Sequence, residues 1–164
     1  MRQKTFAAGL AAGLAAVLLG GSPALADTKH DLARLRALTT KYHDVRAALA
    51  DGYVATGTCV PGMGYHYANP AYAKDGVVDP WKPEVVLYVP SKHGPKLAGV
   101  EYMKVDADQK LTTDGDRPTV FGKPFEGPMP GHEAGQPIHY DKHVWLWLHN
   151  PKGTFAQMNP KVHC

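Results

Sequence analysis

Residues 84–105, with the sequence EVVLYVPSKHGPKLAGVEYMKV, decide the fold of this chain. Residues 84–89 and 97–105 are rich in Val, Leu and Tyr, which suit a pleated and half-buried strand. The turn sequence Ser-Lys-His-Gly lies between them, and Pro90 and Pro95 border it. The pattern therefore predicts an antiparallel hairpin made of two strands.

Three further β-prone segments extend this hairpin into a sheet. The longest covers residues 139–148, with the sequence HYDKHVWLWL, and shorter ones cover 64–67 and 119–121. Gly, Pro and Asp are frequent in residues 106–118 and 122–137, which we interpret as loops. Strands that follow one another with turn-rich connections are typical of a mainly antiparallel sheet.

One helical pattern precedes the strands. Apolar residues recur every three or four positions between residues 29 and 51, and they form a single stripe: Leu32, Leu35, Leu38, Tyr42, Val45 and Leu49. Thr28 followed by Asp31 is typical of a helix start, and Gly52 is typical of a helix end. The predicted fold class is α+β, with one N-terminal amphipathic helix packed on a mainly antiparallel sheet that can roll toward a barrel.

The first 26 residues have the features of a secretory signal peptide. Arg2 and Lys4 precede an uncharged run over residues 6–19, and Ala24-Leu25-Ala26 supplies a small-residue cleavage site. The apolar run is shorter than the roughly 20 residues that a membrane-spanning helix needs, so we predict no stable membrane anchor. We expect cleavage after Ala26, which leaves residues 27–164 as a single secreted or extracytoplasmic domain.

The charge balance and the cysteines narrow the class of protein further. Removal of residues 1–26 would take away two of the 18 basic residues and none of the 15 acidic ones, and such a balanced charge argues against nucleic acid as a partner. Cys59 and Cys164 form an even pair, which in an exported chain predicts a disulfide. It would close a loop of about 100 residues, worth about 4–5 kcal/mol in the chain-entropy model. The alternative is a pair of soft metal ligands.

Nine histidines stand out in the composition, and two of them fall in the last predicted strand. Alternation along residues 139–148 places His139, Asp141 and His143 on one face of that strand. The two imidazoles would lie about 13 Å apart along an ideal strand, at about 3.3 Å per residue. Both can bind one ion only if the strand is irregular between them, whereas His143 alone can join ligands from neighbouring strands.

Two other polar residues interrupt apolar segments: Glu101 in the hairpin and His66 between two tyrosines. Imidazoles combined with a carboxylate suit transition metals such as zinc and copper. We therefore predict a copper or zinc site with these ligands: His66, Glu101, His143 and, if the strand bends, His139. Asp141 and Glu84 are candidate carboxylates that would not bind the ion themselves but would accept the other ring N–H of a ligand imidazole and so orient it.

A protein with such a site can either bind the metal ion alone or use it in catalysis. The chain contains no G-x-S-x-G and no H-E-x-x-H motif, so metal binding is favoured over an enzymatic role. A metal-dependent enzyme that keeps one coordination position open is the first alternative.

Other interpretations involve no resident metal ion. The first is a binding module for haem or another aromatic or apolar ligand, with His66 or His143 as an axial ligand and a pocket lined by Tyr65, Tyr67, Tyr88, Trp145 and Trp147. A buried network of His and Glu hydrogen bonds, and a purely structural envelope protein, also remain open. The remaining candidates are interpreted as solvated: His30, His43, His93, His132 and His163.

Four segments of the chain also support a resemblance. They are GMGYHY at residues 62–67, PEVVLY at 83–88, GVEY at 99–102 and HYDKHVWLW at 139–147. In these segments, and in the closing Asn159-Pro160 and Cys164, the chain resembles a group of small exported bacterial proteins of uncharacterised function. The resemblance implies export and one compact domain, and it implies no activity.

Overall fold

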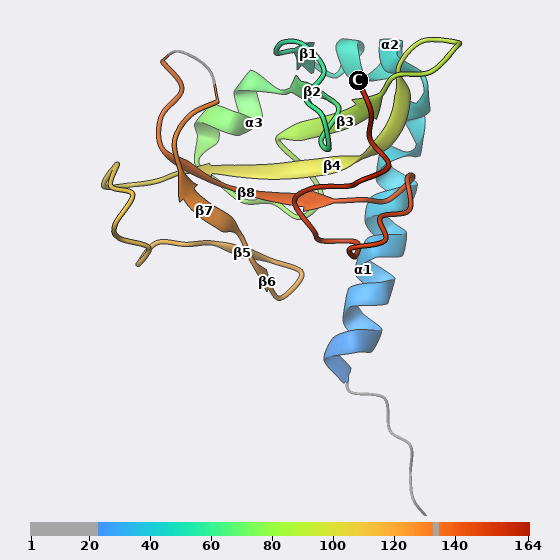
Figure 1. Ribbon diagram of the computed structural model, residues 1–164. Helices are drawn as coiled ribbons and strands as arrows, with labels where there is room; N and C mark the ends of the chain where they lie inside the picture. Colours follow the sequence, from blue (N-terminus) through green and yellow to red (C-terminus); the bar gives the residue numbers. More distant parts are fainter. Residues whose placement is uncertain (1–22, 133–134) are drawn as a thin grey trace, which may run out of the picture.

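The computed structural model describes residues 23–132 and 135–164. The predicted signal peptide, residues 1–26, lies almost entirely outside them. The centre of the fold is a six-stranded sheet with the order β1-β2-β3-β4-β8-β7, in which every pairing is antiparallel (Figure 1). β1 and β7 are the two edges, so this sheet is open and does not close into a barrel.

The hairpin predicted from residues 84–105 lies in the middle of the sheet. β3 (Val85–Val89) pairs with β4 (Lys96–Val105), with a bulge between Leu87 and Tyr88. The outer strands are β2 (Tyr65–Ala68) and β1 (Val54–Ala55) on one side, and β8 (His139–Val144) and β7 (Glu126–Met129) on the other. A separate two-stranded ribbon is formed by β5 (Thr119–Val120) and β6 (Lys123–Pro124).

Two predictions for the C-terminal part of the chain were wrong. β8 ends at Val144 rather than at residue 148, because the N–H groups of Trp147 and Leu148 both donate to the carbonyl of Ala98 and interrupt the regular ladder. β6 and β7 lie in residues 122–137, which were predicted to be a loop. Proline has no N–H to donate, but an edge strand such as β7 tolerates Pro128 because one side of its ladder is unpaired.

The predicted single helix over residues 29–51 is interrupted. It consists of α1 (Pro23–Thr39), a 3-10 turn η1 (Thr40–His43) and α2 (Val45–Ala50). The hydroxyl groups of Thr39 and Thr40 donate to carbonyls one turn earlier, a bond that bends helices. Asp44 then starts α2 by accepting a hydrogen bond from the N–H of Arg46 at 3.0 Å.

A third helix was not predicted. α3 (Pro70–Asp75) begins after Asn69, whose side chain accepts from the N–H groups of Ala71 and Tyr72. Asn at the cap followed by Pro is a common helix start, so the signal was present in the sequence.

Different segments bury the two faces of the sheet. On one face, Leu35 of α1 belongs to a buried cluster with Val100 and Tyr102, and Tyr42 of η1 belongs to a second one with Val86. On the other face a third cluster combines strand residues with the C-terminal segment, and its members are Val85, Leu87, Ala98, Trp145 and Val162. That second face also carries the polar residues described below.

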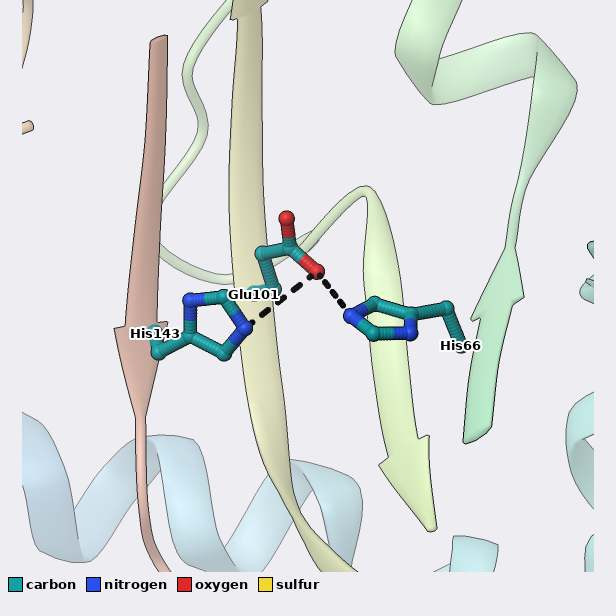
Figure 2. Close-up of side chains that lie close together, drawn as sticks. All are labelled: His66, Glu101 and His143. Carbon is teal, nitrogen blue, oxygen red and sulfur yellow. Dashed lines mark ion pairs between the residues drawn. The ribbon is translucent and has the colours of Figure 1, made fainter. Parts of the chain in front are cut away.

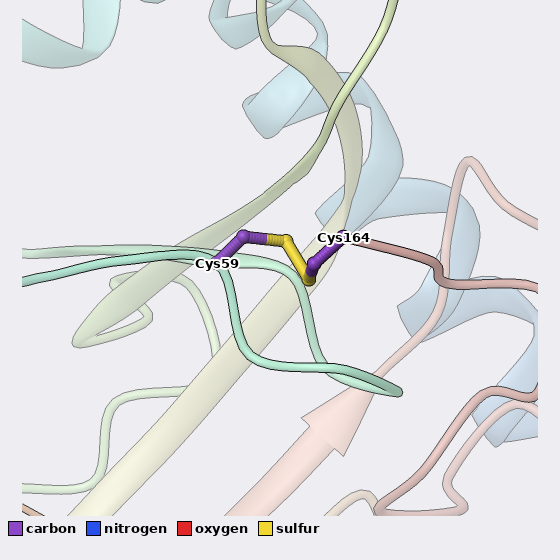
Figure 3. Close-up of a disulfide and its surroundings, with 2 residues drawn as sticks. All are labelled: Cys59 and Cys164. Atoms are coloured by element: carbon purple, nitrogen blue, oxygen red, sulfur yellow. A yellow bond between two sulfur atoms is a disulfide. The ribbon is translucent and has the colours of Figure 1, made fainter.

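The predicted disulfide between Cys59 and Cys164 is present, with the two Cα atoms 5.7 Å apart (Figure 3). Beside it, the N–H of Gly62 donates to the carbonyl of Val162, and the N–H of Asn159 donates to the carbonyl of Gly62. The C-terminal segment is therefore fixed to the loop that precedes β2. Among the residues that the structure describes, no helix combines the length and apolar character of a membrane span.

Candidate metal centre

Three strands bring His66, Glu101 and His143 together on one face of the sheet. Glu101 of β4 is paired directly with His143 of β8. His66 of β2 reaches the same place from the far side of β3 (Figure 2). Because side chains alternate along each strand, the period-2 pattern turns all three toward the face opposite α1.

The distances within this group suit a single ion. Nε2 of His66 lies 3.3 Å from Oε2 of Glu101, and Nε2 of His143 lies 3.8 Å from the same oxygen. One ligand atom from each residue lies within 4.8 Å of the other two. Two ligand atoms that each lie about 2.1 Å from a tetrahedral zinc ion are about 3.4 Å apart. The three side chains therefore need only small adjustments to bind one ion.

The group contains polar atoms that are buried without a hydrogen-bond partner. Within the described residues, no hydrogen-bond partner exists for Oε2 of Glu101 or for either ring nitrogen of His143. The two side chains are only 6% and 1% exposed. A buried polar atom that is left unpaired costs about 1–3 kcal/mol, so this arrangement favours an additional species that binds them.

Burial shifts the pKa values of all three groups in the direction that favours the neutral form of each group. Burial, together with the nearby His132, lowers the pKa of His66 to about 4, and burial together with His66 lowers the pKa of His143 to about 3. Burial raises the pKa of Glu101 well above its ordinary value, and the carboxyl groups of Asp141 and Glu84 add to the effect. Neutral imidazoles are the form that binds a metal ion, and a cation would neutralise the Glu101 carboxylate.

Neighbouring residues fix the site. The indole of Trp145 stacks on the His143 ring with an angle of 18° between their planes, and its N–H donates to the carbonyl of Ala156 at 2.7 Å. Gly64, immediately before β2, has a φ of +94°, and a Cβ there would lie 2.2 Å from the carbonyl oxygen of Tyr88. Glycine therefore lets β2 approach β3 closely.

A cavity of about 640 Å³ opens beside the three side chains. His66, Glu101 and His143 all line it, together with the thioether residues Met63 and Met103. Small-molecule sites in proteins commonly have a volume of about 300–1,000 Å³. An ion bound by these three residues would face a space large enough for a further ligand.

The predicted fourth ligand, His139, does not join this group. β8 pairs with β4 residue by residue and without a bulge, so His139 and His143 remain four positions apart on a regular strand. The structure instead groups His139 with His132 and Asp141. Asp141 faces the other nitrogen of the His143 ring, but at 4.0 Å, which is longer than a hydrogen bond. Burial raises the pKa of Asp141 to about 6.

Glu84 is buried, and its Oε2 accepts a hydrogen bond from the backbone N–H of Met103 at 3.2 Å. None of the hydrogen bonds or ion pairs among the described residues connects it to His66 or His143, so it does not orient a ligand imidazole as predicted.

The five aromatic residues predicted to line a ligand pocket do not share one cavity. Tyr88 is in the core beneath η1, and Trp145 is in the core beneath the C-terminal segment. Trp147 contacts His43 and Arg36 on the helical side. Tyr65 and Tyr67 line a separate hollow of about 170 Å³. None of the five lines the large cavity, so the arrangement gives no support to a haem pocket built from them.

Three residues at this site were not predicted from the sequence. His132 was interpreted as solvated, yet it lines the cavity and lies next to His139, with 5.2 Å between the ring centroids. Met63 and Met103 were not considered as site residues. Met103 is two positions after Glu101 in β4, so the strand pattern places both side chains on the same face.

No protein-family model, curated protein or solved structure matches the chain.

Proposed function

We propose that this protein binds a transition-metal ion, zinc or copper, through His66, Glu101 and His143. One observation carries the proposal: buried atoms of Glu101 and His143 without hydrogen-bond partners converge with His66 at the spacing of metal ligands. A closed hydrogen-bond network would leave fewer such atoms unpaired. The ligand set of two imidazoles and one carboxylate is also found in catalytic zinc sites.

The surroundings of the site bear on the choice of ion. Imidazole and carboxylate are ligands for zinc and for copper in its oxidised form, whereas thioethers favour the reduced copper ion. Met63 and Met103 line the same cavity, so a copper ion that changes its oxidation state would have soft donors nearby. Zinc needs no such donors, and the two ions are therefore separated by measuring which one the protein retains.

A metal-dependent enzyme is the second candidate, and the cavity is the observation that favours it. Catalytic zinc sites have three protein ligands and keep a fourth position for water or substrate, whereas structural sites have four protein ligands. The site offers three residues and adjoins a space of about 640 Å³. An ion held there would be able to bind and polarise a small oxygen-containing substrate.

We infer that the protein works outside the cytoplasm. The signal-like pattern of residues 1–26 supports export, and the disulfide between Cys59 and Cys164 is the kind of bond that persists in oxidising compartments.

Elemental analysis of the protein, purified without an affinity tag or a chelator, tests this function. We expect copper or zinc in the wild type, less metal in His143→Ala, and no loss in His93→Ala, which changes an exposed histidine on the β3–β4 turn. A wild type that contains no metal, and that retains none after exposure to each ion, would show that the proposal is wrong. An envelope protein with a purely structural role would give that result.

A further inference from the structure

A second group of potential ligands lies next to the first one. His132, on the connection between β7 and β8, lies beside His139 and Asp141 of β8, and one ligand atom of each lies within 4.8 Å of the other two. Asp141 also faces His143, with 4.0 Å between Oδ1 and Nδ1. Because residues 139, 141 and 143 alternate along one strand, β8 turns all three of these side chains to the same face.

His139 has the hydrogen-bonding pattern of a metal ligand. Its Nδ1 lies 3.1 Å from the carbonyl oxygen of Pro137, and since a carbonyl can only accept, Nδ1 carries the proton. Nε2 is then the nitrogen with the free lone pair. This atom is buried and has no hydrogen-bond partner among the described residues, and the whole residue is only 1% exposed. Ligand histidines commonly donate their other N–H to a backbone carbonyl in this way.

Asp141 is also held in place. It is buried, and Nε2 of Gln157 lies 3.4 Å from one of its carboxylate oxygens and 3.5 Å from the other. The backbone N–H of His132 donates to the side chain of Gln136 at 2.7 Å, which positions the loop near the cavity. A carboxylate and two imidazoles are suitable ligands for zinc.

We propose that His132, His139 and Asp141 bind a second metal ion of the zinc class, adjacent to the ion at His66, Glu101 and His143. The inference goes beyond the proposed function, because that function needs one ion only. The second site differs from the first in access: His132 is exposed, whereas the first site has no exposed ligand. The second ion is therefore expected to exchange faster than the first.

Equilibrium dialysis of the metal-free protein against zinc, followed by elemental analysis, tests this proposal. We expect two equivalents in the wild type, one in His139→Ala and one in His132→Ala. His93→Ala is the matched control and should keep two. His132 is exposed, so its substitution is expected to leave the fold intact, and His132→Ala decides the question if His139→Ala does not fold. Circular dichroism of each variant establishes folding.

The possible results separate the two proposals. One equivalent in the wild type that is lost in His143→Ala and kept in His132→Ala would overturn the second site alone. One equivalent that is lost in His132→Ala and His139→Ala but kept in His143→Ala would overturn the first site alone. No zinc in any variant, the wild type included, would overturn the second site and would leave copper as the only ion for the first, which the elemental analysis above decides.

Discussion

Glu101 and His143 are direct partners on neighbouring antiparallel strands, and Oε2 of the carboxyl group lies 3.8 Å from Nε2 of the imidazole. The two residues are 42 positions apart in the chain, so their contact depends on the pairing of β4 with β8. Both are buried, and among the described residues Oε2 of Glu101 and the two ring nitrogens of His143 have no hydrogen-bond partner. Their position on paired strands gives the site a rigid base, which suits the selective binding of an ion.

Zinc should stabilise the folded protein through Glu101. At a zinc concentration about 100 times the Kd, the ion should raise the free energy of unfolding by about 2.7 kcal/mol per site. Glu101→Gln removes the only carboxylate of the first site. A 100-fold loss of affinity there would reduce its contribution to about 0.4 kcal/mol at the same zinc concentration. Urea unfolding with and without zinc measures the difference.

Asp114→Asn is the control for this experiment, since it changes an exposed carboxylate in the loop before β5. It should respond to zinc like the wild type. Equal stabilisation of wild type and Glu101→Gln by zinc would exclude Glu101 as a ligand.

Gly99→Ala should weaken both the fold and the metal site. A Cβ at residue 99 would lie 2.4 Å from the carbonyl oxygen of Val144, a backbone atom that cannot rotate away. We expect a loss of about 1–3 kcal/mol in the free energy of unfolding, together with weaker zinc binding because the ligand His143 immediately precedes Val144 in β8. Thermal unfolding and zinc titration measure the two effects.

Gly115→Ala provides the comparison, because a Cβ there has no atom within 4 Å. It should leave the stability and the zinc affinity close to those of the wild type. If Gly99→Ala behaves in the same way, the backbones of β4 and β8 are not as close at Gly99 and Val144 as the structure indicates.

Glu84 should make stability depend on pH. Burial raises the pKa of its carboxyl group from 4.5 to about 8 in the folded state, so the folded protein disfavours loss of that proton. The contribution of Glu84 is therefore fully present below pH 4.5 and is lost as the pH rises to about 8, with a slope of at most about 1.4 kcal/mol per pH unit. Glu84→Gln should remove this dependence.

The measurement is urea unfolding of metal-free wild type and Glu84→Gln at several pH values between 5 and 8. The variant should gain stability relative to the wild type as the pH rises. A constant difference across this range would mean that Glu84 titrates at an ordinary pKa.

Loss of the disulfide should destabilise the protein strongly. Cys59 and Cys164 are separated by 105 positions, and the chain-entropy model assigns about 4–5 kcal/mol to the closure of a loop of that size. The double variant Cys59→Ser, Cys164→Ser should lose a comparable amount in urea unfolding. Added reductant should lower the wild type to the same stability and leave the variant unchanged, and a variant as stable as the oxidised wild type would contradict the expectation.

Local patterns were sufficient to predict the central hairpin. Residues 84–105 contain both strands and the turn, so their pairing needs no information from elsewhere in the chain. Alternation also placed His139, Asp141 and His143 on one face of their strand. The helix break was harder to predict, because the apolar stripe continues through it while the Thr39 and Thr40 hydroxyls compete for backbone carbonyls.

The composition of the site depended on contacts between distant segments. The strand pattern showed that His139 and His143 could share an ion only at an irregularity, and β8 proved regular. His132 gave no signal, because it lies in a Gly- and Pro-rich connection without periodicity, and only the fold brings it to His139. The aromatic residues were assigned to a common pocket from their type, although packing divides them between separate clusters.

The register of β8 has a consequence for folding errors. A shift of one residue in its pairing with β4 would turn His139, Asp141 and His143 toward the apolar side beneath α1, and Tyr140 and Val144 toward the cavity. Such a misfolded chain would bury a carboxylate among apolar side chains and would also lose its ligands. A bound metal ion would therefore favour the correct strand pairing, since it stabilises only the chain in which β8 is aligned with β4 in the native register.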